Sequence, residues 1–328
     1  MFGVFVAICP DFCYHKIMKP SEQSIIATLV YFDIFDYPLT LIELRRFILQ
    51  LIVEGYGYVP SLKELDAAMA DSEILRKSIR FKNGFFYLKG KEDNVRKRLE
   101  RYVLADKKYK AALRVARIIS RIPFVRFIGV CNSLAYSNTS KESDIDLVII
   151  TRPGGAWWAR AFSLLFLSLF RLRPGQGDNQ DKICLSVFLD EDNLDLRDLR
   201  MGKRDIDFTY WAANFYPLYD AGGYFERFWR ANRSWINESL PAAKPALAHA
   251  SRTIFHAPSI NKAIEYILLP LTPIIRELQK KKFPNSIRLL VNVDTRVRVQ
   301  DGLLKFHVND RRLEHMEKFV EKYEKVIS

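Results

Sequence analysis

The sequence predicts an α+β fold in which a small mixed sheet with helices is flanked by two mostly helical regions. Three apolar runs rich in β-branched residues, near residues 127–131, 144–151 and 182–189, predict the strands. A helix-length apolar stretch separates the last two, and helical periodicity dominates on either side. With 328 residues and 49% hydrophobic content, the chain is long enough for about two globular domains.

The N-terminal part, residues 18–90, is predicted to hold three helices and a hairpin. The helices are expected at 21–33, 41–54 and 61–70, and Asn83-Gly84 marks the turn of a hairpin over 79–88. This order resembles a winged helix, a fold often used on DNA, although the third helix has more acids than bases. Residues 1–17 are expected to be a poorly ordered tail or an upstream over-prediction of the start.

Positive charge is concentrated in residues 76–126, where 17 lysines and arginines stand against four acids. The resulting +13 equals the net charge of the whole chain. The hairpin is followed by a basic linking helix, residues 91–121, with one apolar stripe made of Val95, Leu99, Val103, Leu113 and Ala116. This basic surface predicts an RNA, DNA or nucleotide partner, and the alternative is a solvated face without a partner.

Two carboxylates at strand spacing are the most informative feature of the chain. Asp144 and Asp146 begin the second apolar run, and Asn132-Ser133 follows the first. Side chains at i and i+2 of a strand share a face, so the two carboxylates are expected side by side. Because they repel each other unless a cation lies between them, the pair predicts a site for Mg²⁺ or Mn²⁺ that also holds substrate phosphates.

At these residues the chain resembles the nucleotidyltransferase superfamily typified by DNA polymerase β. More narrowly, it resembles an uncharacterised bacterial group in which a winged-helix-like segment precedes that domain. The resemblance implies a polymerase β-like core over 122–200, in which Asp144 and Asp146 bind the catalytic metal ions. It also implies that Ser133 and the amides beside Asn132 hold the phosphates of a nucleoside triphosphate, and Lys182 is expected to reach the phosphate oxygens from the third strand.

The chain departs from the superfamily pattern in two places. Asn132 stands where the superfamily has glycine, and asparagine tolerates left-handed backbone angles. The third strand has no internal acid: Cys184 or Ser186 stands where the third metal ligand is expected. Three acids, Asp190, Glu191 and Asp192, come only at the end of that strand, and whether one of them completes the site is left open.

Two functions follow from the sequence. The first is a Mg²⁺-dependent nucleotidyltransferase that moves a nucleoside monophosphate from a triphosphate to a hydroxyl acceptor and releases pyrophosphate. The acceptor is a small molecule, a protein side chain or an RNA end, and no residue of the sequence indicates which of the three it is. The second is a catalytically inactive protein of the same fold that acts as a nucleic-acid-binding or regulatory module.

The C-terminal third is predicted to be mostly helical. It divides into an aromatic-rich helical extension (201–240), a linker (241–258) and a final region (259–328). His307 has polar neighbours in the sequence, and we expect it to be structural rather than a general base.

Cysteine usage and hydropathy favour a cytoplasmic protein. Cys9 and Cys13 lack a matching ligand pair, and Cys131 and Cys184 fall in predicted core strands, so neither a disulfide framework nor a zinc site is expected. The apolar stretch 156–172 contains and ends on arginine, which predicts a buried crossover helix and no membrane partner. The oligomeric state is left open.

Overall fold

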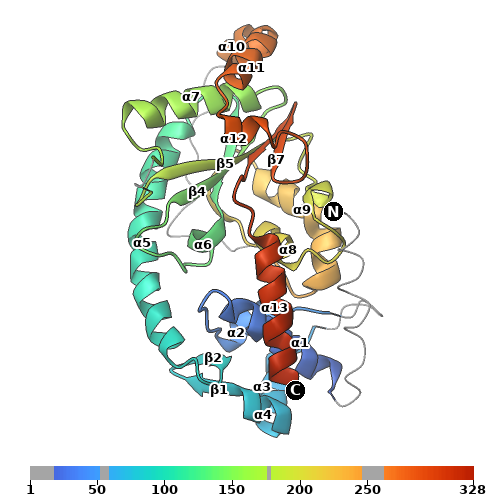
Figure 1. The fold of residues 1–328 in the computed structure, drawn as a ribbon. Helices are drawn as coiled ribbons and strands as arrows, with labels where there is room; N and C mark the ends of the chain where they lie inside the picture. Colours follow the sequence, from blue (N-terminus) through green and yellow to red (C-terminus); the bar gives the residue numbers. More distant parts are fainter. Residues whose placement is uncertain (1–17, 52–58, 176–178, 246–261) are drawn as a thin grey trace.

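The computed structural model describes residues 18–51, 59–175, 179–245 and 262–328 (Figure 1). The predicted tail 1–17, with Cys9 and Cys13, and most of the predicted linker 241–258 lie outside these ranges. The described parts form a mixed α+β structure, as predicted.

A six-stranded mixed sheet forms the centre of the molecule. Its strands, in spatial order, are β6 (Tyr216–Asp220), β3 (Val125–Val130), β4 (Ile145–Thr151), β5 (Ile183–Asp190), β8 (Leu303–Phe306) and β7 (Val297–Gln300). Only β4 and β5 run parallel, because the crossover helix α7 (Ala156–Leu169) connects them. The predicted crossover helix is thereby confirmed, but it is buried on one side only, with Leu165 and Leu169 exposed.

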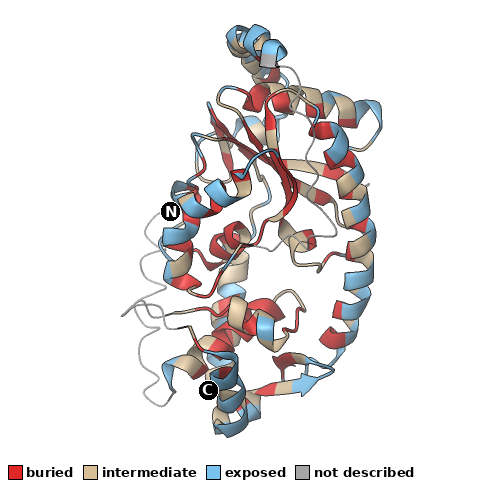
Figure 2. Cartoon of the chain, turned by 180° about the vertical axis from the view of Figure 1, so that it is seen from behind, coloured by how far each residue is buried: buried red, intermediate tan, exposed pale blue. Residues whose placement is uncertain are grey.

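Each face of the sheet has its own hydrophobic core. Alternate residues of β4 point to opposite faces: Leu147 and Ile149 pack with α7 and the long helix α5, whereas Val148 and Ile150 pack with the helices that follow β5. Asp144 and Asp146 are in phase with Val148, so their carboxylates lie on the second face. Figure 2 shows the strands of the sheet as a buried layer.

Three strands come from segments that the sequence predicts to be helical or outside the core. β6 pairs with β3, and the hairpin of β7 and β8 pairs with β5, so residues 216–220 and 297–306 extend the sheet beyond the predicted core 122–200. The C-terminal third, predicted to be mostly helical, thus also supplies three strands that the sequence analysis did not identify. Strands of four or five residues are too short for a periodicity signal, although Asp301-Gly302 between β7 and β8 is a strong hairpin dipeptide.

The N-terminal part contains the predicted helices and hairpin. They are α1 (Pro20–Asp33), α2 (Leu41–Arg46), α3 (Leu62–Asp71), a further short helix α4 (Glu73–Ser78), β1 (Ile79–Lys82) and β2 (Phe85–Leu88). Asn83 and Gly84 both have positive φ angles, 52° and 84°, as a tight hairpin turn requires. The second helix ends at Arg46, earlier than predicted, and residues 52–58 lie outside the described part.

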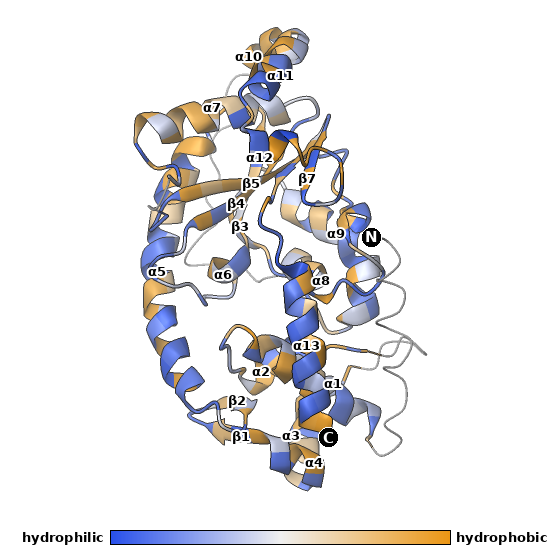
Figure 3. Ribbon diagram, viewed as in Figure 1, coloured by the Kyte–Doolittle hydropathy of each residue, from blue (hydrophilic) through white to orange (hydrophobic). Residues whose placement is uncertain are grey.

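Helix α5 (Asp93–Ile119) runs along one side of the molecule from the hairpin to the sheet (Figure 1). Its bounds agree with the predicted helix, and its predicted apolar stripe is confirmed in part, because Val95 and Ala116 are buried. Leu99 and Val103 are half or more exposed, at 50% and 60%, whereas Arg98 and Lys108 are buried. Figure 3 shows hydrophilic residues along much of α5 and hydrophobic ones along α7.

The C-terminal helices lie on both faces of the sheet. They are α8 (Ile206–Ala213), α9 (Tyr224–Ser239), α10 (Lys262–Leu268), α11 (Thr272–Lys281), α12 (Asn285–Arg288) and α13 (Arg312–Ile327). Helices α8, α9 and α13 pack in the core of the second face, whereas α11 and α12 pack with α7 in the core of the first. The last helix leaves the sheet and packs on α1 and α8, so the two ends of the described chain meet (Figure 1). Within the described ranges, no helix has the length and apolar character needed to cross a bilayer.

Candidate metal and nucleotide site

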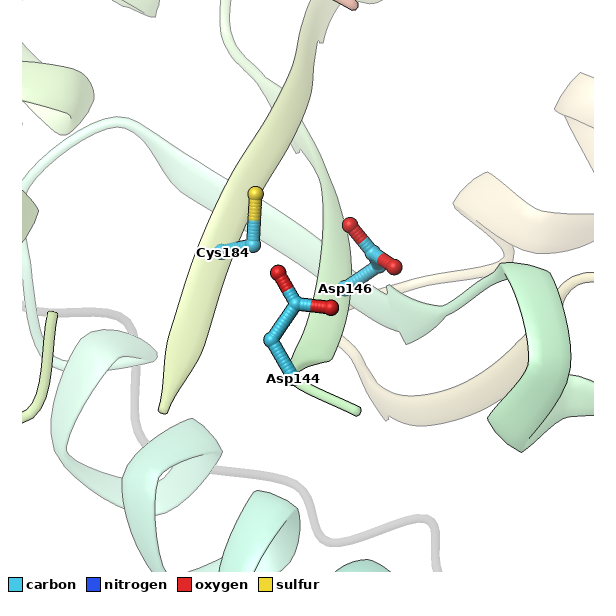
Figure 4. A group of neighbouring side chains, drawn as sticks. All are labelled: Asp144, Asp146 and Cys184. Carbon is cyan, nitrogen blue, oxygen red and sulfur yellow. The ribbon is translucent and has the colours of Figure 1, made fainter. Parts of the chain in front are cut away.

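Asp144, Asp146 and Cys184 converge at the start of β4 and β5 (Figure 4). One ligand atom from each residue lies within 4.8 Å of the others, and all three side chains are half-buried. Asp146 stands opposite Cys184 in the parallel register of the two strands. The predicted carboxylate pair therefore forms, and a thiol occupies the position beside it.

Two hydrogen bonds fix the carboxylate of Asp146. Asn132 Nδ2 donates to one oxygen at 2.7 Å, and Ser186 Oγ donates to the other at 2.5 Å. Charge-assisted bonds of this kind are stronger than neutral ones. They leave the carboxylate in one orientation with lone pairs still available to a cation.

Asn132 holds the turn that the sequence predicts. Its φ angle is 55°, in the left-handed region that favours glycine, and asparagine is among the few other residues that enter it at low cost. Asn132 begins the short helix α6 (Asn132–Ala135), so Ser133 lies in its first turn. Here asparagine supplies both the turn and a donor to Asp146, which glycine would lack.

Acidic groups are crowded together at the site. Burial and the neighbouring charge of Asp146 raise the pKa of the Asp144 carboxyl to about 6. Burial, then Asp146, also raises the pKa of the Cys184 thiol above its usual range. A divalent cation among these groups would favour their charged forms, so the donor set fits such an ion.

The acids at the end of β5 do not complete the site. Asp190 pairs in register with Thr151 at the far ends of the two strands, six residues beyond Cys184, a separation of about 20 Å along the strand. Its carboxylate accepts hydrogen bonds from Asn193 and from the backbone of Asp192, while Glu191 pairs with Arg227. Cys184, and not a third acid, is the third group beside the carboxylate pair.

Lys182 extends away from the carboxylate pair. Its Nζ donates to the carbonyl oxygen of Arg171 at 3.0 Å, just after α7, and the residue does not line the pocket beside the carboxylates. The role of Lys182 in phosphate binding therefore remains a prediction. Its contact with Arg171 does not favour that role.

A pocket of about 620 Å³ opens beside the carboxylate pair. The sheet side of its wall carries four of the residues described above, namely Asn132, Ser133, Asp144 and Ser186. The remaining wall comes from α1 and the segment after it, residues 136–143 before β4, Val187 of β5, Lys305 of β8, α8, α13, the loop before α13 and Arg101 of α5. The volume is typical of a site for one or two small molecules.

The pocket contains a group that the sequence analysis does not single out. His315 of α13, Asp207 of α8 and Tyr31 of α1 form a hydrogen-bonded set in its wall. The three residues are separated by more than 100 positions along the chain, so no local spacing connects them. His307, the histidine that we expected to be structural, also lines the pocket, and burial followed by the nearby charge of Lys305 lowers its pKa.

Much of the basic charge of α5 is used inside the molecule. Arg98 pairs with Glu43 at 2.6 Å, and Lys97 pairs with Asp36 at 3.0 Å. Others on the same helix are exposed to solvent, among them Arg96, Lys107, Lys110 and Arg114. The basic surface that the sequence predicts to bind a polyanion is therefore limited to the outer face of α5.

Comparison of the chain with protein-family models, with curated proteins and with solved structures finds no significant match.

Proposed function

We propose that this protein is a metal-dependent nucleotidyltransferase that transfers a nucleoside monophosphate from a triphosphate to a hydroxyl acceptor. The observation that carries the proposal is the convergence of Asp144 and Asp146 beside the Asn132-Ser133 turn, next to a pocket of small-molecule size that Asp144 lines. The core around this site is, in the same proposal, polymerase β-like, and the N-terminal helices with their hairpin are winged-helix-like.

Asp144, Asp146 and Cys184 would hold the metal. A bound Mg²⁺ or Mn²⁺ supplies neutralisation of phosphate charge and alignment of the leaving pyrophosphate. Two carboxylates suit either ion, and the thiol favours the softer of the two, Mn²⁺. We therefore expect activity with both ions and tighter binding of Mn²⁺.

The other residues of the site position the substrate. Ser133 and the free amides of its helical turn bind phosphate oxygens, because the first N–H groups of a helix have no partner within it. Asn132 and Ser186 keep Asp146 in place. The acceptor hydroxyl then attacks the α-phosphorus in line, and the bond to the pyrophosphate oxygen breaks.

A catalytically inactive, nucleic-acid-binding protein of the same fold is the second candidate. The observation that favours it is the absence of a third carboxylate near Asp144 and Asp146 in the described residues, together with the exposed cations on α5. Such a protein would bind nucleic acid through charge alone, with an affinity that falls steeply as salt increases.

Binding and transfer of labelled nucleotides test the proposal. Each of the four α-³²P-labelled nucleoside triphosphates is mixed with Mg²⁺ or Mn²⁺ and with bulk RNA, a small-molecule extract or the protein alone. Wild type is compared with Asp146→Asn and with the control Asp192→Asn, an exposed acid outside the site. We expect metal-dependent binding and label transfer by wild type and the control, and loss of transfer by at least about 100-fold in Asp146→Asn.

Two results would contradict it. If triphosphate binding does not depend on metal and is unchanged by Asp146→Asn, the triphosphate does not bind at the carboxylate pair. No transfer to any acceptor, combined with salt-dependent RNA or DNA binding that Asp146→Asn leaves unchanged, would favour the second candidate.

A further inference from the structure

The pocket wall formed by α1, α8 and α13 carries a histidine–carboxylate pair. His315 Nδ1 lies 2.9 Å from Asp207 Oδ2, and the Tyr31 hydroxyl donates to Asp207 Oδ1 at 2.6 Å. All three residues line the pocket that also contains Asp144 and Ser133. The pair thus belongs to the same chamber as the carboxylate site but to a different part of its wall.

Hydrogen-bond logic fixes the tautomer of His315. An ionised carboxylate only accepts hydrogen bonds, so the proton of the Asp207 contact is on Nδ1 of the imidazole. Nε2 of a neutral ring then has a lone pair. In the described part of the chain Nε2 makes no hydrogen bond, and the His315 side chain is 15% exposed, which makes it accessible from the pocket.

The surroundings keep the ring in this orientation. Phe35 packs against the His315 ring edge to face, with centroids 4.9 Å apart, and Asp207 is held by Tyr31 on the other side. A carboxylate that orients a histidine and fixes its tautomer is the arrangement by which proteins prepare imidazole as a base or a ligand. A fold-stabilising role alone would not require an oriented imidazole with an unused ring nitrogen in the wall of a pocket.

The pocket limits the size of the molecule that can bind beside His315. Three separate parts of the chain enclose about 620 Å³, and the wall beside His315 includes the rings of Phe35 and Trp211. A pocket of this size accommodates small molecules, whereas a strand of RNA needs an open groove that follows its backbone. The apolar rings would cover the carbon skeleton of such a molecule while the histidine contacts its polar group.

We propose that this wall is the acceptor subsite, that the acceptor is a small hydroxyl compound, and that His315 accepts the proton of its hydroxyl with Asp207 as positioning residue. The inference rests on the proposed nucleotidyl transfer. In the step, the acceptor oxygen forms a bond to the α-phosphorus, the bond from that phosphorus to the bridging oxygen breaks, and pyrophosphate leaves. The hydroxyl proton moves to His315 Nε2 and later to water.

The test uses the full-length protein, the four α-³²P-labelled triphosphates and two separate acceptors, the small-molecule fraction of a cell extract and bulk RNA. Wild type is compared with His315→Ala, Asp207→Asn and the control Glu317→Gln, an exposed residue on the same helix. Triphosphate dissociation constants and thermal unfolding are measured beside transfer. His315→Ala is also assayed with added imidazole, which can replace a missing base but does not repair a misfolded site.

We expect His315→Ala to bind triphosphate within about twofold of wild type and to lose transfer by about 100-fold or more. Imidazole should restore part of that loss, Asp207→Asn should lose about 10-fold, and Glu317→Gln should behave as wild type. Transfer by His315→Ala at the wild-type rate, a loss that imidazole does not relieve, or label found only on RNA would each overturn the inference while leaving nucleotidyl transfer standing. No transfer by wild type would instead defeat the proposed function, and the inference with it.

Discussion

Asn132 combines a backbone role and a side-chain role at one position. Its left-handed φ angle of 55° is one that alanine adopts only at a cost of about 1–2 kcal/mol, whereas glycine adopts it freely. Its amide also donates to Asp146 at 2.7 Å. The two roles can be separated by substitution.

We expect Asn132→Ala to unfold at lower denaturant than Asn132→Gly, by about 1 kcal/mol in the free energy of unfolding. Both variants lose the hydrogen bond to Asp146, so both should bind metal and triphosphate more weakly than wild type. Chemical denaturation and metal titration measure the two effects. Equal stability of the two variants would show that the left-handed angle is not maintained in solution.

Cys184 stands beside the carboxylate pair, and replacing it with an acid tests whether that position is a ligand position. A third carboxylate adds like charge to a half-buried cluster, so Cys184→Asp should be less stable than wild type without metal. With Mg²⁺ it should gain more stability than wild type, because hard oxygen ligands suit that ion. Thermal unfolding across a Mg²⁺ series measures this, with Cys184→Ser as the uncharged control. A Mg²⁺ response no larger than that of wild type would place Cys184 outside the coordination shell.

At the scale of elements, Lys108 ties α5 to the loop that delivers Asp144. Its side chain is 3% exposed, its Nζ donates to the carbonyls of Lys141 and Ser143, and it pairs with Asp181 at 3.1 Å. Lys107, the next residue, is exposed to solvent. The two lysines therefore form a matched pair for substitution.

Lys108→Met should lower the free energy of unfolding by about 2–3 kcal/mol, because it removes a buried donor from the carbonyl groups of Lys141 and Ser143. Lys107→Met should change it by less than about 0.5 kcal/mol. Urea denaturation of both variants measures the difference. Similar effects at the two positions would mean that the Lys108 contacts contribute little to the fold.

Glu265 fastens α10 to the start of β3. Burial alone would raise the pKa of its carboxyl, but hydrogen bonds from Arg126 and the Phe124 amide, aided by Arg152, outweigh burial and lower it. The Arg126 bonds measure 2.7 and 2.9 Å, and the Glu265 side chain is 1% exposed. The charged form therefore stabilises the folded state.

The sign of the pH dependence follows from that lowered pKa. The contribution is complete above the unfolded value of about 4.3 and is lost as the pH falls through the lower folded value. We expect Glu265→Gln to lower the free energy of unfolding by about 3 kcal/mol at pH 7 and by less at pH 3, because the unfolded wild type is protonated there and part of the stabilisation is gone. Denaturation of both proteins from pH 3 to 7 measures this. A difference that stays constant across that range would rule out the charged pair as its source.

At the scale of the whole molecule, the pocket exists only because distant parts of the chain meet. α13 crosses from the sheet to pack on α1, and the walls come from α1, the β3–β4 region, α8 and α13. A ligand in the pocket therefore contacts both ends of the described chain at once. Ligand binding should therefore have measurable effects in parts of the chain that are far in sequence from Asp144 and Asp146.

Triphosphate with Mg²⁺ should slow amide hydrogen exchange in α1 and α13 as well as in residues 132–146. At a ligand concentration of about 100 Kd the expected stabilisation is about 2.7 kcal/mol for exchange by global unfolding. Exchange through local opening of the hairpin of β1 and β2, which does not line the pocket, should not change. Protection confined to residues 132–146 would indicate a ligand that does not reach the α13 wall.

Local patterns in the sequence determine the elements that carry strong signals. The capping boxes of α2 and α3, the Asn83-Gly84 turn, α5, the crossover α7 and the strands β3 to β5 all follow from neighbours a few residues apart. The carboxylate pair belongs to this group, because side-chain alternation in one strand places Asp144 and Asp146 on one face.

Only the tertiary structure decided the rest, because it depends on contacts between residues far apart in the chain. β6, β7 and β8 are too short for a periodic signal and are strands because β3 and β5 offer them free edges. The buried arginine and lysine of α5 pair with Glu43 and Asp181, partners that no helical period encodes. Cys184 stands beside the carboxylates through the register of β4 and β5, and the Tyr31, Asp207 and His315 set depends on the packing of three helices that sequence distance keeps apart.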